Sequence, residues 1–247
     1  MYKFIKIALS TIGIAVAIQL AACAGMQQGS AQKRNAPSQQ MELADINIQL
    51  GIAYLQSGDP ARAKQKFLMA MQQAPSYSAA WYGMGYYLEK VGDKSEAERY
   101  YLKAIQLAPH SGSAQNNYGT FLCRQKQYKK AIDHFMLAVN DPAYLSGAEA
   151  YENAGICALQ IPDKQLAENY FQKAIQIDPQ RPLALMELTK LKSAQGEYRV
   201  ALEYMERYLS SYQPTKATLT LAIGIAQKAH DQALEIKYTE LLKEKFS

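Results

Sequence analysis

The side chains of this 247-residue chain that could act as nucleophiles or metal ligands are few: three cysteines and three histidines. His110, His134 and His230 are far apart in the sequence, and none has a partner at the spacing of a metal-binding motif. The sequence also contains no glycine-rich phosphate loop and no nucleophile elbow. We therefore predict no catalytic site, no metal site, no cofactor and no small-molecule substrate.

Cys23 stands at the end of a segment that is typical of export signals. Lys3 and Lys6 precede an apolar stretch, Ile7–Leu20, and small residues follow it. The sequence Leu-Ala-Ala-Cys that ends at Cys23 resembles the bacterial lipobox. The resemblance implies that this cysteine is diacylated on sulfur, becomes the N-terminus after cleavage, and is acylated on its amine. Residues 1–22 would then be a lipoprotein signal peptide, and three acyl chains would anchor the protein to a membrane.

The alternative is an uncleaved transmembrane anchor, because Phe4–Ala22 approaches the length of about 20 residues that a spanning helix needs. Cysteine at the lipobox position and the polar sequence directly after it favour the lipoprotein. Both interpretations export the rest of the chain. The residue after the cysteine is Ala24 rather than aspartate. By resemblance to sorting in Gram-negative lipoproteins, we expect lipid anchorage in the outer membrane, on its periplasmic face.

The segment Gly25–Gln40 is rich in glutamine, serine, alanine, asparagine and glycine and carries no apolar stripe of helical period. We predict that residues 23–40, the lipidated cysteine included, form a flexible tether. About 16 coil residues span roughly 20–25 Å on average, so the folded part would lie a short way from the bilayer.

The net charge of the whole chain is only +5. It falls to about +3 once Lys3 and Lys6 leave with the signal peptide. The remaining charges are spread along the chain, without a basic cluster. We therefore predict no binding to nucleic acid.

An internal repeat organises the sequence after residue 40. Four glycines recur at intervals of 34, 34 and 36 residues: Gly51, Gly85, Gly119 and Gly155. Twelve residues after each glycine comes an alanine, four residues later an aromatic residue, and three residues later another alanine; after Gly85 these are Ala97, Tyr101 and Ala104. Small residues at fixed heights let two antiparallel helices approach closely, while the aromatic ring fills the space between them.

These positions match the 34-residue tetratricopeptide pattern, which predicts pairs of antiparallel helices. We expect an all-α, right-handed superhelical solenoid of about six helix pairs in residues 41–246. The expected repeats are residues 44–77, 78–111, 112–147, 148–181, 182–215 and a degenerate 216–246. The fifth repeat has Thr189 in place of the glycine, which predicts looser packing, and we expect Gly224 to be the glycine of the sixth.

The first helix of each repeat should line the concave face of such a solenoid, where exposed side chains can bind a protein segment. The predicted protein-binding groove mixes aliphatic, aromatic, amide and charged residues: Ile48, Ile52, Tyr82, Tyr86, Asn116, Thr120, Arg124, Glu152 and Ile156. The fifth repeat adds Met186 and Lys190 on the same side. Tyrosine and arginine are frequent binding hot spots.

Cys123 and Cys157 fall on the first helices of adjacent repeats. Equivalent positions in neighbouring repeats are expected about 10 Å apart, beyond the ~7 Å limit between the Cα atoms of a disulfide. An oxidising compartment would allow a bridge. We nevertheless predict two separately buried thiols.

The order of lipobox, polar tether and about six repeats resembles the PilF/PilW family of type IV pilus biogenesis and stability lipoproteins, the pilotins. The stretch Asn116–Cys123, Asn-Asn-Tyr-Gly-Thr-Phe-Leu-Cys, is similar to a stretch of that family. The resemblance implies that the protein binds the secretin subunit of the type IV pilus and promotes its outer-membrane localisation and multimerisation. The alternatives are a lipoprotein scaffold for outer-membrane barrel assembly or for peptidoglycan enzymes, and an enzyme whose site is carried on an inserted loop.

Overall fold

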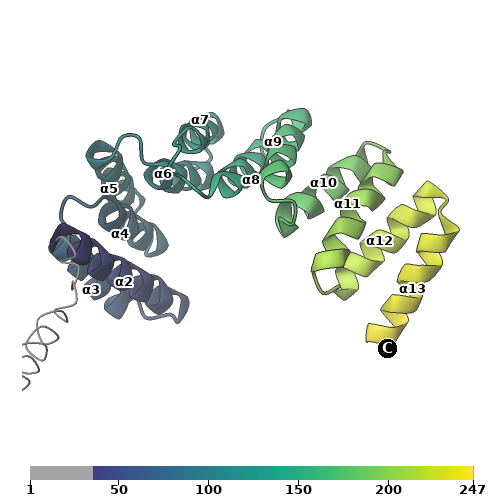
Figure 1. Ribbon diagram of the computed structural model, residues 1–247, viewed down its shortest axis with the longest axis horizontal. Coiled ribbons are helices and arrows are strands. Elements are labelled where there is room, and N and C mark those ends of the chain that lie inside the picture. Colours follow the sequence, from purple (N-terminus) through teal and green to yellow (C-terminus); the bar gives the residue numbers. More distant parts are fainter. Residues whose placement is uncertain (1–35, 247) are drawn as a thin grey trace, which may run out of the picture. The chain divides into compact units, whose positions relative to one another are not determined.

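The computed structural model describes residues 36–246, which form twelve α-helices and no β-strand (Figure 1). The helices form six consecutive pairs: α2 (Ala36–Gln56) and α3 (Pro60–Gln73), α4 (Ser78–Lys90) and α5 (Lys94–Leu107), α6 (Gly112–Arg124) and α7 (Tyr128–Val139), α8 (Gly147–Ala158) and α9 (Lys164–Ile177), α10 (Pro182–Ala194) and α11 (Tyr198–Ser211), α12 (Lys216–Ala229) and α13 (Gln232–Phe246). From α4 onward, the two helices of each pair pack on each other, and each second helix packs on the first helix of the next pair where one follows. The predicted all-α solenoid of six helix pairs is confirmed.

The turn within most pairs uses one repeated position with left-handed backbone. Gly58, Gly92 and Gly196 lie there with φ angles of 78°, 93° and 81°. Lys126 and His230 occupy the same position in the third and sixth pairs, with φ angles of 64° and 56°. Left-handed backbone ends a helix, and glycine adopts it without steric cost. The repeat is therefore visible in the backbone as well as in the packing.

Aspartates begin four of the second helices. The side chains of Asp59, Asp93, Asp163 and Asp231 accept hydrogen bonds from backbone N–H groups three residues later, at 3.0, 3.2, 3.0 and 3.0 Å. Each bond satisfies a donor that has no partner inside the helix. The aspartate thus fixes the residue at which each of these second helices starts.

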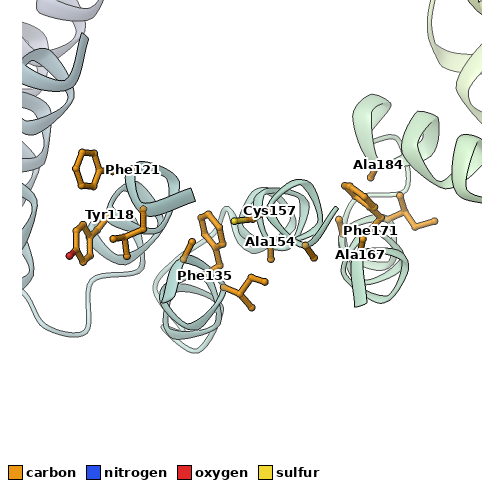
Figure 2. Close-up of a cluster of buried hydrophobic side chains, with 14 of the residues drawn as sticks. Tyr118, Phe121, Phe135, Ala154, Cys157, Ala167, Phe171 and Ala184 are labelled. Carbon is orange, nitrogen blue, oxygen red and sulfur yellow. The ribbon is translucent and has the colours of Figure 1, made fainter. Parts of the chain in front are cut away.

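The core consists of rings packed on the repeat glycines. A Cβ atom on Gly119 would lie 2.9 Å from the ring of Phe135 and 3.0 Å from the Ala131 carbonyl oxygen. A Cβ on Gly155 would lie 2.7 Å from the ring of Phe171. Both rings are fully buried, and Figure 2 shows Phe135 next to Cys157 of the following repeat. Only glycine leaves enough room for this approach.

The fifth and sixth repeats depart from this packing. Thr189 is fully buried and its hydroxyl donates to the Leu185 carbonyl at 2.8 Å, so the extra side chain is accommodated inside the repeat. Ile223 follows Thr189 by 34 residues and holds the repeat position in α12. Gly224 lies one residue later, and a Cβ there would have nothing within 4 Å. The expectation that Gly224 acts as the packing glycine is wrong, because the register places it on another side of the helix.

The start of the helical region also differs from the expectation. Helix α2 begins at Ala36, so the last five residues of the predicted tether, 36–40, are helical. The predicted signal peptide, Cys23 and the rest of the tether lie outside the described residues. None of the described helices is both long enough and apolar enough to span a membrane.

Candidate functional site

Eight of the nine predicted groove residues share two positions of the repeat, three residues before and one residue after the repeat glycine. These positions are one helical turn apart and lie on one side of the first helices α2, α4, α6 and α8. The ninth residue, Arg124, ends α6. Six of the nine side chains are exposed or half-buried: Ile52, Tyr82, Tyr86, Thr120, Arg124 and Ile156. We call these six residues the first-helix surface.

Three of the predicted groove residues are buried instead. Ile48, Asn116 and Glu152 expose only 5%, 5% and 8% of their area. Ile48 packs in the core of the first two repeats. The two polar residues are used inside the protein, as described below, so all three are removed from the contact surface. The helical period alone does not distinguish these buried residues from the exposed ones. The position three residues before the repeat glycine and the position one residue after it lie on the same side of the helix.

Glu152 connects α8 to the start of α10. One carboxylate oxygen pairs with the guanidinium group of Arg181, and the other accepts the backbone N–H of Ala184 at 3.1 Å. Ala184 lies in the first turn of α10, where N–H groups lack helical partners and the helix dipole favours a negative charge. The carboxylate therefore caps a helix of the next repeat.

Asn116 connects α6 to α8. Its side-chain oxygen accepts a hydrogen bond from the amide of Asn153 at 3.1 Å. Its backbone carbonyl accepts the hydroxyl of Thr120 at 2.8 Å. These bonds satisfy polar groups that would otherwise be costly to bury.

Glu89 connects α4 to α6 through Arg124. The Arg124 Nη2 atom lies 2.7 Å from a carboxylate oxygen of Glu89, and Nε contacts the other oxygen. The Tyr101 hydroxyl also donates to this carboxylate, at 3.2 Å. The side chain of Arg124 remains 42% exposed, whereas that of Glu89 is only 8% exposed. Arg124 can therefore donate further hydrogen bonds to a partner while its position is fixed by the ion pair.

Cys123 and Cys157 form a disulfide between α6 and α8, with their Cα atoms 5.8 Å apart. The prediction of two separate thiols is wrong. The distance of about 10 Å separates helix axes, whereas each Cα lies about 2.3 Å from its axis, so two residues that face each other approach to about 5–6 Å. Both cysteines lie on facing sides of their helices.

Tyr82 of the first-helix surface is protonated at neutral pH. Burial, and then the negative charge of Asp45, raise the pKa of Tyr82 to about 12. The Lys90 ammonium group lies 5.2 Å from the centre of the Tyr86 ring. Both rings pack partly against the core, which holds them in place. The surface thus presents fixed aromatic rings, hydroxyl groups, aliphatic side chains and one arginine, which suit a protein segment.

The sequence analysis did not identify Glu89, Asn153 and Arg181 as the partners of Arg124, Asn116 and Glu152. For one of these pairs the sequence holds a weak signal, because Glu89 and Arg124 are 35 residues apart, one repeat plus one position. Opposite charges at such a spacing are expected to meet across neighbouring first helices. In residues 36–246 no group of three or more histidine, cysteine, aspartate or glutamate side chains is arranged to hold a metal ion.

Comparisons with known proteins agree with the repeat pattern. The tetratricopeptide repeat family matches residues 48–112, 82–145 and 148–181, together more than half of the chain. The type IV pilus assembly protein PilF of Pseudomonas aeruginosa is 26% identical over 202 residues, which span 82% of this chain and 80% of that protein. A Haemophilus influenzae protein is 31% identical over 138 residues, which span 56% of this chain and 77% of that protein.

Two solved structures resemble this one over most of its length. The P. aeruginosa PilF structure superposes with a TM-score of 0.70 at 28% identity, covering 84% of this chain and 93% of that one. The structure of PilW, a widely conserved type IV pilus biogenesis factor, gives 0.67 at 27% identity, covering 82% and 93%. The chain belongs to the tetratricopeptide repeat family, and over more than 80% of its length it is similar to the type IV pilus biogenesis factors PilF and PilW.

Proposed function

We propose that this protein is an outer-membrane lipoprotein, anchored through Cys23, that binds a type IV pilus secretin subunit and promotes its outer-membrane localisation and multimerisation. The observation that carries the proposal is the similarity to PilF and PilW, which extends over more than 80% of this chain and 93% of each solved structure. The lipobox-like sequence and the first-helix surface support it. The tetratricopeptide repeat family consists of scaffolds without a typical catalytic role, which agrees with a binding protein.

The proposed mechanism is one of location and capture. The acyl chains on Cys23 fix the protein to the inner leaflet of the outer membrane, and the first-helix surface holds a segment of an unassembled secretin subunit. Confinement to one membrane raises the effective concentration of the captured subunits, which favours ring assembly without any chemical step. The exposed Arg124 and Ile156, with the two fixed tyrosines, provide polar and apolar contacts for such a segment.

Replacement of the lipidation site tests the anchoring step. In cells, Cys23→Ser should leave a folded, helical protein that no longer fractionates with the outer membrane. Assembled secretin rings should then be lost from outer-membrane fractions, as measured by resistance of the multimer to denaturing electrophoresis. Rings that remain at the wild-type level would show that delivery by this anchor is not required.

Substitutions on the first-helix surface test the capture step. Tyr86→Ala, Arg124→Ala and Ile156→Asp should each reduce co-purification of the secretin, while circular dichroism shows unchanged helix content. Leu137→Asp is the matched control, because Leu137 is 50% exposed but lies on the second helix α7. Secretin capture that is unchanged in all three variants would exclude this surface. Capture of a barrel-assembly factor or of a peptidoglycan enzyme in place of the secretin would favour the alternative scaffold functions.

A further inference from the structure

Two adjoining depressions lie between the first helices of the last two repeats, α10 and α12. Their volumes are about 490 and 690 Å³, and Ala217 and Leu221 line both. Together they extend from Pro182 at the start of α10 to Lys228 in the last turn of α12. We call this continuous depression the terminal groove. It is separate from the first-helix surface, whose six residues belong to the first four repeats.

The floor of the terminal groove is apolar and open. Leu183 is 40% exposed, and Met186 and Leu221 are half-buried. Gly224 lies in the middle of α12, and a Cβ there would meet nothing within 4 Å. Glycine inside a helix is destabilising relative to alanine, and it is often found where another backbone approaches closely. None of the described residues uses the space above Gly224.

The rim of the terminal groove is positively charged. Lys190, Lys216 and Lys228 line it, whereas the one acidic residue of the lining is Glu187. Glu187 is already paired with Lys190, 2.7 Å away. The ammonium groups of Lys216 and Lys228 therefore have no carboxylate partner in the lining of the groove. An occupant with carboxylates beside an apolar stripe complements this distribution of charge.

The lining also selects the backbone conformation of an occupant. The hydroxyl groups of Thr218 and Thr220 donate to the backbone carbonyl groups of Thr215 and Lys216, at 2.9 and 2.8 Å. Few polar groups remain to satisfy the backbone of an extended peptide, whereas a helix satisfies its own N–H and C=O groups. The 14 residues of α12 correspond to a helix of about 20 Å, which is long enough for an occupant of about four turns.

We propose that the terminal groove binds an amphipathic helical segment of a partner protein, with apolar residues toward Leu183, Met186 and Leu221 and with aspartate or glutamate residues beside Lys216 and Lys228. When a helix binds in a groove, its apolar residues at positions i, i+3 or i+4, and i+7 insert into the groove. The inner face of the segment lies over Gly224, where a small side chain on the protein permits the closest approach. This site does not depend on capture of a secretin by the first-helix surface.

Selection from a displayed library of random helical peptides tests the proposal. The full-length protein, purified in detergent, is the target. The enriched peptides should carry an apolar stripe at the helical period flanked by aspartate or glutamate. Three changes then locate their binding site. Gly224→Leu fills the groove, the double change Lys216→Glu with Lys228→Glu reverses its charge, and Lys129→Glu with Lys130→Glu on α7 is the matched control.

Fluorescence anisotropy with the enriched peptides gives the decisive measurement. We expect both groove variants to weaken binding at least tenfold and the control to leave it within about twofold of the wild type. Thermal unfolding checks that each variant is folded, and the charge reversal still tests the site if Gly224→Leu fails to fold. The proposal is overturned by enrichment of peptides without acidic residues, by no enrichment above a selection without protein, or by binding that a folded groove variant leaves unchanged. Because the readout contains no secretin, its result is independent of the proposed function.

Discussion

The middle repeats and the last two repeats use the same positions of the first helix in opposite ways. From α4 to α10, side chains at or near these positions join neighbouring first helices: Glu89 with Arg124, Asn116 with Asn153, Cys123 with Cys157, and Glu152 with Arg181. Within residues 36–246 no hydrogen bond, ion pair or disulfide joins α10 to α12. The terminal groove lies where such links would be expected.

The difference shows that a regular repeat does not give a uniform surface. Where first helices are linked, the links hold neighbouring side chains in place, as on the first-helix surface. Unlinked first helices leave an apolar depression with room for another helix. Since stability in a solenoid is roughly the sum of repeats and their interfaces, each link can be tested by itself.

The disulfide should have the largest effect on this comparison. It closes a loop of 34 residues, so replacing both Cys123 and Cys157 with alanine should lower the free energy of unfolding by about 3–4 kcal/mol. Urea unfolding followed by circular dichroism measures the change. A reducing agent should reproduce it in the wild-type protein and have no effect on the double variant. Equal stability of the oxidised and reduced protein would show that the disulfide does not stabilise the contact between α6 and α8.

The buried carboxylate of Glu152 should have the next largest effect. Glu152→Ala leaves the Arg181 guanidinium group and the Ala184 N–H without their partner, at a cost of about 2–3 kcal/mol in the free energy of unfolding. The matched control is Glu203→Ala, an exposed glutamate on α11, which should change stability by less than about 0.5 kcal/mol. Similar values for the two variants in urea titrations would contradict the assigned cap.

The same substitution at two glycines should have opposite signs in the two regions. Gly119→Ala places a methyl group 2.9 Å from the Phe135 ring and should destabilise the protein by about 1 kcal/mol, after the gain in helix propensity. Gly224→Ala meets no neighbour within 4 Å and should stabilise it by about 0.5–1 kcal/mol. Differential scanning calorimetry of both variants decides the matter. A loss of stability at Gly224 would mean that the groove is already filled.

Acidification should weaken the middle repeats slightly more than the last two. Burial lowers the pKa of His134 below its ordinary value of 6.5, although the charge of Asp133 opposes this shift. As the pH falls, the unfolded chain therefore binds this proton before the folded protein does. The contribution of neutral His134 to the free energy of unfolding is complete above about pH 6.5 and is lost as the pH falls through the lower pKa of the folded state. Between about pH 7.5 and pH 5.5 the free energy of unfolding should fall more steeply in the wild type than in His134→Gln. Parallel curves would mean that this imidazole does not contribute.

The repeated glycines, alanines and aromatic rings were sufficient to predict the helix pairs. Their spacing brings small residues of two helices together and places an aromatic ring between the helices. The turn at His230 shows the same logic, since the left-handed position recurs even where glycine is absent. Burial at the groove positions was not predictable in the same way. Asn116 and Tyr82 lie at equivalent positions, yet Asn116 is buried against Asn153 while Tyr82 remains partly accessible. The outcome depends on the side chain that the neighbouring repeat presents.

The amino-acid sequence by itself determined the helix pairs and their order, because these depend on local propensity and a fixed period. Only the tertiary structure decided that Cys123 meets Cys157, that Glu152 caps α10, and that Gly224 opens a groove. The physical reason is that neighbouring helices approach to within a few ångströms on their facing sides. A shift of one residue in register therefore moves a side chain from the core to a binding surface.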